Sequence, residues 1–161
     1  MPITATITVR SDAFPDGEPI PRKHSGEGPD LSPPLSWSNV PEKTQELALI
    51  VDDPDAPSGD WVHWVLYGMP PDTKGLKGGI PRQPTLTDPP GAVQGRNDWP
   101  ADNIGYRGPH PPPGKTHRYQ FKLYALDSEL DLKPGLTKRQ LLEAMSGHVL
   151  AEGKLTGTYK R

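Results

Sequence analysis

Two stretches of the sequence carry the residue types that could do chemistry. Residues 52–57 (DDPDAP) hold three carboxylates and two prolines, and residues 61–64 (WVHW) follow with a histidine close to two tryptophans. Residues 105–114 (GYRGPHPPPG) form a glycine- and proline-rich segment, and His117 and Tyr119 come shortly after it. Each stretch therefore places a histidine beside a rigid turn that offers carboxylates or open backbone amides.

Two imidazoles, a carboxylate and a rigid loop can line a small polar pocket. Protonated imidazoles give charge-assisted hydrogen bonds to a compact anion such as phosphate, and loop amides add donors. His63, His117 and one or two Asp side chains would also suit zinc or iron. Spacing alone does not decide, because the two histidines lie far apart in the sequence. We expect an oxyanion rather than a metal, because we expect two histidines to converge on the glycine- and proline-rich loop, with no thiolate and no third histidine joining them.

Each feature also has a simpler structural interpretation. Asp side chains are common in turns because they bond the nearby backbone. A single histidine in a strand is more often a half-buried residue than a ligand, and proline-rich loops are mostly rigid connectors. His24, His110 and His148 have no comparable neighbours and are treated as background. The conjunction of the two stretches, rather than any single residue, favours a pocket.

An enzyme is the alternative interpretation of the same residues. A hydrolase would use His63 or His117 as general base, with Asp53 orienting the ring. Its weakness is the nucleophile, because the chain has no cysteine and Ser58 lies in no recognisable nucleophile motif. We therefore expect a binding protein that is not an enzyme.

The elements that position these residues are mainly strands. Apolar patterning predicts strands over 3–9, 46–52, 61–67 and 118–126, with a short last strand at 156–159. Residues 32–37 predict a short extended piece, and 69–105 a long polar stretch. A capping box at Thr137 and Gln140 predicts one helix over 137–152. The expected architecture is an all-β sandwich with a short C-terminal helix, in a single domain over 1–161.

Composition excludes several classes of protein. The 161 residues carry a formal net charge of -2, so general nucleic-acid binding through phosphate neutralisation is not expected. No apolar run approaches the ~18 residues of a membrane span, and the N-terminus has no signal-peptide pattern. The cytoplasm is the expected compartment. The lack of cysteine excludes disulfide scaffolds, and 22 prolines with 17 glycines indicate many turns and little helix.

The two stretches give the chain a recognisable pattern. Residues 53–64 (DPDAPSGDWVHW) and 105–121 (GYRGPHPPPGKTHRYQF) resemble the two motifs of the phosphatidylethanolamine-binding protein family. Residues 32–37 (SPPLSW) and 95–99 (GRNDW) resemble its shorter bacterial and archaeal branch. The resemblance runs from about residue 20 to the C-terminus.

This resemblance implies a Greek-key β-sandwich of two antiparallel sheets with a small anion-binding pocket near one end. It also implies a cis peptide bond between Ala56 and Pro57. The segment between Pro57 and Trp61 is shorter than in animal members, and their long C-terminal extension has no counterpart here. Carried over by position, the pocket lining would be Asp53, His63, Pro112, His117 and Tyr119, with Asp55 supporting the turn and Tyr106 and Gly108 in the adjoining loop.

The expected function is binding of a small anion or phosphate group, with no cofactor and no metal. The ligand would be a phospholipid head group or another phosphorylated molecule. His63 and His117 would donate as imidazolium ions, and Asp53 would orient a ring or accept from a protonated ligand oxygen. Pro112 and Tyr119 would form apolar walls. A kinase or protease target, regulated by inhibition, and a homodimer are further expectations.

Overall fold

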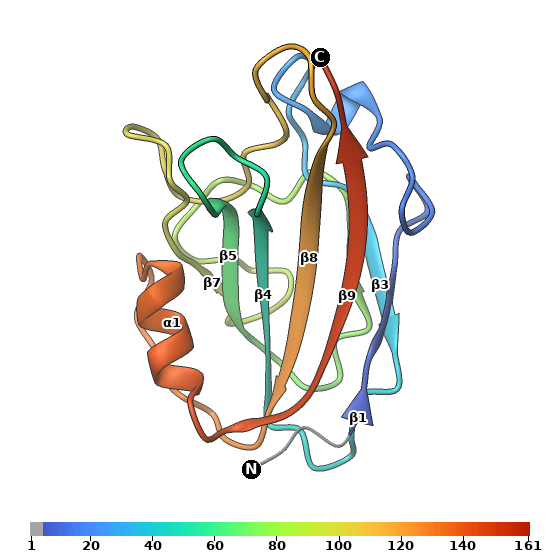
Figure 1. The fold of residues 1–161 in the computed structure, drawn as a ribbon. Helices are drawn as coiled ribbons and strands as arrows, with labels where there is room; N and C mark the ends of the chain where they lie inside the picture. The colour runs from blue at the N-terminus through green and yellow to red at the C-terminus, as the bar shows by residue number, and fades with distance from the viewer. Residues whose placement is uncertain (1–4) are drawn as a thin grey trace.

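Two β-sheets face each other across a hydrophobic core in the computed structural model, which describes residues 5–161 (Figure 1). The larger sheet consists, in spatial order, of β1 (Ala5–Thr6), β9 (Val149–Tyr159), β8 (His117–Leu126), β4 (Glu46–Asp53), β5 (Trp61–Met69) and β7 (Val93–Gln94). The smaller sheet consists of β2 (Thr8–Arg10), β3 (Leu35–Ser38) and β6 (Gly75–Leu76). A 3-10 turn, η1 (Arg22–His24), and a helix, α1 (Lys138–Met145), lie outside the sheets.

The strand order contains a Greek key. In the larger sheet β4, β5 and β7 follow one another in space, and β8 returns to lie beside β4. These four strands pair antiparallel throughout, which gives the 4-1-2-3 order of the motif. The predicted β-sandwich with a short C-terminal helix is therefore confirmed. One pairing departs from the all-antiparallel expectation, because β1 runs parallel to β9.

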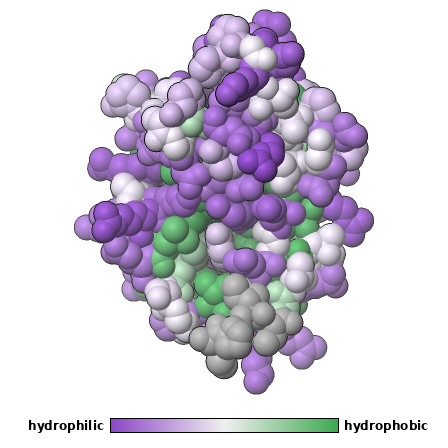
Figure 2. All heavy atoms as spheres, in the orientation of Figure 1, coloured by the Kyte–Doolittle hydropathy of each residue, from purple (hydrophilic) through white to green (hydrophobic). Residues whose placement is uncertain are grey.

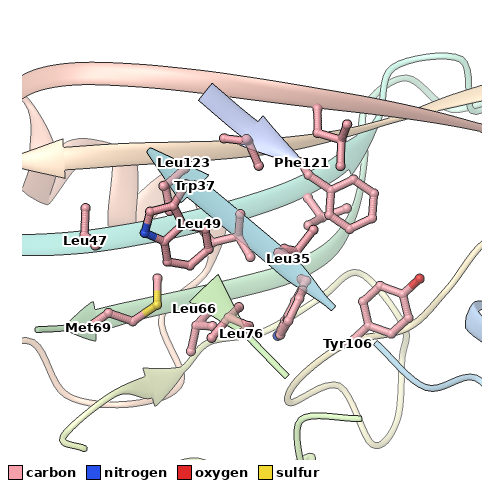
Figure 3. Close-up of a cluster of buried hydrophobic side chains, with 14 of the residues drawn as sticks. Leu35, Trp37, Leu47, Leu49, Leu66, Met69, Leu76, Tyr106, Phe121 and Leu123 are labelled. Atoms are coloured by element: carbon pink, nitrogen blue, oxygen red, sulfur yellow. The ribbon is translucent and has the colours of Figure 1, made fainter. Parts of the chain in front are cut away.

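Side chains on both faces of the central strands β4 and β5 are buried. The inner face packs against the smaller sheet, and Figure 3 shows Leu49 and Phe121 directed toward Leu35 and Trp37. The outer face packs against α1, whose Leu141 belongs to a second cluster of buried apolar side chains. All eight residues of β4 are consequently buried, which explains why its sequence is apolar without alternation. Three predicted strands, 46–52, 61–67 and 118–126, are confirmed as β4, β5 and β8.

The N-terminal strand prediction, residues 3–9, was only partly right. Its first two residues lie outside the described part of the chain. The rest divides into β1 and β2, which belong to different sheets and are separated by the buried Ile7. The chain passes from the larger to the smaller sheet here. Apolar and polar residues therefore keep alternating along the sequence, although the strand with which they pair changes from β9 to β3.

The predicted helix, residues 137–152, was too long. Its capping box between Thr137 and Gln140 is present, but the helix ends at Met145 and Gly147 follows with a φ of 81°. Residues 149–159 are instead the long strand β9, of which only 156–159 was predicted. Glycines occupy two inward positions of β9, Gly153 and Gly157, so its apolar alternation is weak in the sequence.

The outer face of the larger sheet carries a charge cluster beside α1. The carboxylate of Asp52 is buried, and its Oδ2 accepts from the amines of Lys122 at 2.8 Å and Lys138 at 2.7 Å. Lys138 also lies 3.6 Å from Asp60, which is half exposed. The cluster joins β4, β8 and α1, on a face that is mostly hydrophilic (Figure 2).

Within residues 5–161 no helix has the length and apolar character that crossing a membrane requires.

We expect the charge cluster around Asp52 to stabilise the fold. Asp52→Asn leaves two partly buried lysines without their carboxylate, so the free energy of unfolding falls by about 1.5–3 kcal/mol, the range for hydrogen bonds to charged groups. Asp60→Asn is the matched control, because it removes an exposed partner of Lys138 and costs less than about 1 kcal/mol. Urea unfolding followed by circular dichroism measures both. Equal losses in the two variants would contradict this account.

Candidate functional site

A cavity of about 270 Å³ lies where two loops meet at one end of the larger sheet. The loop from β4 to β5 and the loop that leads into β8 both lie at this end (Figure 1). The cavity is lined by one carboxylate, three histidines, three large aromatic side chains and small or proline side chains: Asp53, Ala56, Pro57, Ser58, Trp61, His63, Trp99, His110, Pro111, Pro112, His117 and Tyr119. All five lining residues predicted from the sequence are therefore brought together here.

A buried hydrogen bond joins His117 to Asp53. Nδ1 of His117 lies 2.7 Å from Oδ2 of Asp53, and both side chains are about 5% exposed or less. The other carboxylate oxygen, Oδ1, accepts the backbone N–H of Asp55 at 2.8 Å. A carboxylate cannot donate, so the proton between the two side chains sits on Nδ1 of His117. The second ring nitrogen, Nε2, is left for other partners.

A β-bulge positions His63. On β5, Val62 pairs with Asp52 and Trp64 pairs with Val51, so His63 is an extra residue with no partner on β4. Bulges re-aim side chains, and here both His63 and Trp64 are directed to the inner side of the sheet. Nδ1 of His63 lies 2.6 Å from the carbonyl oxygen of Arg107, which can only accept. Nε2 is again the nitrogen left for other partners.

Aromatic rings surround His63. Its ring centroid lies 5.0 Å from those of Trp99 and Tyr119, both in edge-to-face contact. Burial lowers the pKa of His63, and the Arg107 carbonyl and Asp53 oppose this effect only in part. Burial and the adjacent Asp53 carboxylate raise the pKa of Tyr119, so its hydroxyl stays protonated and can donate.

Two tryptophans of the cavity wall carried no role in the sequence analysis. Trp61 and Trp99 pack edge to face with centroids 5.5 Å apart, and the Arg107 guanidinium lies over the Trp99 ring at 5.9 Å. The loop that carries Trp99 is tied to β5, because Asp98 accepts the backbone N–H of Val62 at 2.7 Å. The sequence signals were that Trp61 belongs to the stretch 61–64 with His63 and that Trp99 belongs to the stretch 95–99.

His110 was wrongly treated as background. It lines the cavity as a third histidine, beside Pro111. The expectation of an oxyanion therefore loses one of its premises, although no group of three or more His, Cys, Asp or Glu within residues 5–161 is arranged to hold a metal ion. The other two background histidines lie elsewhere: Nδ1 of His24 bonds the carbonyl of Leu31, and His148 pairs with Asp127 on the surface.

Three predicted site residues support the cavity without lining it. The Asp55 carboxylate is bound by Arg118 at 2.8 and 2.9 Å, which lowers the pKa of Asp55 to about 2. The buried Tyr106 hydroxyl donates to the carbonyl of His24 at 2.6 Å. The Gly108 backbone N–H donates to Asp30 at 2.7 Å.

The loop around Gly108 approaches neighbouring backbone too closely for a side chain. A Cβ at Gly108 would overlap the carbonyl oxygen of His24. The same loop is also held at Pro111, whose carbonyl accepts from the Arg161 side chain at 3.2 Å.

The prediction of a cis bond between Ala56 and Pro57, which the resemblance implied, was wrong. Within residues 5–161 the cis peptide bond is the one between Asp88 and Pro89.

The arrangement offers two ring nitrogens to one apolar-walled space. In the described residues neither Nε2, of His63 or of His117, has a protein hydrogen-bond partner, and both rings line the cavity. Together with the Tyr119 hydroxyl, they can bind a small polar group, while the tryptophans and prolines contact whatever that group is attached to. The Asp53–His117 pair also has the form of a general base with its orienting carboxylate.

Comparisons with known proteins agree with the overall fold. The family model described as phosphatidylethanolamine-binding protein matches residues 10–160. A UPF0098 protein of Methanothermobacter thermautotrophicus is 52% identical over 96% of this chain and 99% of its own length. In solved structures, the Chlamydia trachomatis protein CT736, described as a homolog of that family, superposes with a TM-score of 0.86 at 44% identity, covering 98% of this chain and 99% of its own. YbcL of E. coli, described as a new member of the mammalian family, gives 0.87 at 34% identity with the same coverage.

The buried environment of His63 should be visible in its titration and in the pH dependence of stability. Because burial lowers its folded-state pKa below the usual 6.5, the ring is neutral at pH 7, and NMR titration of its ring resonances should give a midpoint below 6.5. Below pH 6.5 the unfolded chain takes up a proton that the folded chain does not. The stability from this residue is therefore complete above pH 6.5 and lost as the pH falls toward the folded pKa. A midpoint at or above 6.5 would refute this description.

Proposed function

The chain belongs to the phosphatidylethanolamine-binding protein family, and on that premise we propose that its cavity binds a small phosphate-bearing ligand without transforming it. One observation carries the proposal. His63 and His117 each have Nδ1 engaged by a protein acceptor and, in the described residues, no protein partner on Nε2, and both rings line the same cavity. Ring nitrogens held in this way are pre-organised to meet the oxygens of one compact ligand.

The residues around the cavity take separate roles in this proposal. His117 donates from Nε2 to a phosphate oxygen, and Asp53 compensates the charge of the protonated ring. Tyr119, which lines the cavity near Asp53, adds a hydroxyl. Pro112, with the two tryptophans, contacts the apolar part of the ligand. A phospholipid head group, a nucleotide phosphate and a phosphorylated side chain share this chemistry.

The cavity size is consistent with such a ligand. A volume of about 270 Å³ lies just under the ~300–1,000 Å³ of pockets that hold drug-sized molecules. It therefore exceeds the needs of a bare anion and leaves room for a short substituent. A kinase or protease target and a homodimer stay predictions from the sequence.

A hydrolase is the second candidate, because the Asp53–His117 bond has the geometry of a general base with its orienting group. Such an enzyme needs a nucleophile within reach of the base. Ser58 lines the cavity, but in the described part of the chain its hydroxyl bonds neither His63 nor His117. Binding requires no such group, so we favour it.

The proposal predicts the effect of removing a pocket histidine. His117→Ala should weaken the binding of inorganic phosphate by about ten- to a hundredfold, since a hydrogen bond to a charged group is worth about 1.5–3 kcal/mol. Isothermal titration calorimetry measures the affinity, and thermal melting checks that the variant is folded. His148→Ala is the control, because His148 is exposed and pairs with Asp127 outside the cavity.

Two results would overturn the proposal. One is a His117→Ala variant that binds phosphate as tightly as the parent protein. The other is turnover of p-nitrophenyl phosphate or p-nitrophenyl acetate by the parent protein that His117→Ala abolishes, because this would establish the hydrolase.

A further inference from the structure

The two cavity histidines differ in what their Nδ1 atoms bind. His117 donates to the carboxylate of Asp53 at 2.7 Å, whereas His63 donates to the carbonyl oxygen of Arg107 at 2.6 Å. Neither acceptor has a proton to give, so Nδ1 carries its proton in both rings. Any second proton would therefore sit on Nε2, facing the cavity.

That second proton has different surroundings at the two rings. At His117 the positive charge would lie beside the negative charge of Asp53, so the pair sums to zero. At His63 the ring is buried, its direct partner is a neutral carbonyl, and its nearest rings belong to Trp99 and Tyr119. A buried charge without a partner is costly.

The acidic groups near His63 are already compensated by others. Asp53 is engaged by His117, Asp30 by Arg82 at 2.9 Å and Asp52 by Lys122 and Lys138. The loops around the cavity carry further carboxylates, but in the described residues none of them bonds the His63 ring: Asp55 is bound by Arg118, Asp98 accepts the backbone N–H of Val62, and Asp60 and Asp102 are exposed. The other titratable or charged groups of the cavity and its loops carry no negative charge at neutral pH; they are Tyr106, Arg107, His110, Lys115, His117, Arg118 and Tyr119. His63 therefore presents a lone pair on Nε2, whereas a proton on Nε2 of His117 would be compensated by the Asp53 carboxylate.

We propose that the cavity selects a singly charged phosphate group that keeps one O–H, which donates to Nε2 of His63 while an anionic oxygen accepts from Nε2 of His117. This rests on the proposed function and defines the ligand class as a phosphomonoester or phosphonate in its monoprotonated form. It departs from the sequence-based expectation that both rings donate as imidazolium ions.

Two related ligands fit less well for different reasons. A phosphodiester has the same single charge but no O–H, so it leaves the lone pair of buried His63 without a donor. A dianionic monoester brings a second negative charge into a cavity whose Asp53 and His117 already balance each other. His63 is thus a specificity-determining residue.

Methyl phosphate and dimethyl phosphate separate these cases. At pH 5.5 both carry mainly one negative charge, and calorimetry should find methyl phosphate about tenfold tighter, the value of one well-made hydrogen bond. The second ionisation of a phosphomonoester lies near pH ~6, so this ratio should fall as the pH rises to 7.5. His63→Ala should bring the ratio close to one, whereas His117→Ala should weaken both ligands.

A measurement on the unaltered protein removes any dependence on how the variants fold. Long-range ¹H–¹⁵N NMR of the methyl phosphate complex should show Nε2 of His63 unprotonated. Equal affinities for the two ligands, or a protonated Nε2 in that complex, would overturn the inference and leave the proposed function standing. Failure of both ligands to bind would overturn the proposed function together with the inference.

Discussion

The buried hydrogen bond between Asp53 and His117 is the interaction on which the site depends. It links the end of β4 to the start of β8, so it fixes how the two loops meet over the cavity. Asp53 is itself held by the Asp55 backbone, and Asp55 is held by Arg118 next to His117. This closed set of contacts orients the His117 ring and leaves its Nε2, rather than its Nδ1, available in the cavity.

Adjacent carboxylates on one strand serve opposite purposes. Side chains alternate along β4, so Asp52 points to the outer face and Asp53 toward the cavity. Asp52 binds two lysines and secures α1, while Asp53 binds a histidine and arranges the site. The bulge opposite this position then adds His63 to the inner side. Stability and the candidate site thus depend on neighbouring residues and on one of the two register shifts in the β4–β5 pairing.

Much of this could be predicted from the sequence, and the exceptions have physical causes. Continuous apolar runs identified β4 and β5, because those strands are buried on both faces. The strand β8 was identified by apolar side chains that alternate with polar ones over its first half. The strand β9 was largely missed, since Gly153 and Gly157 stand where apolar side chains would reveal it. His110 and Trp99 reach the cavity through loop geometry that no periodicity encodes. The different roles of His63 and His117 follow from their Nδ1 partners, which only the folded chain brings near.

The most direct test of the account is a crystal structure of the protein grown with inorganic phosphate. The account predicts one phosphate in the cavity, with oxygens ~2.7–3.2 Å from Nε2 of both His63 and His117. It also predicts that Nδ1 of each ring keeps its bond to Arg107 and Asp53. Phosphate bound only on the outer surface, or a metal ion between the two ring nitrogens, would contradict the account.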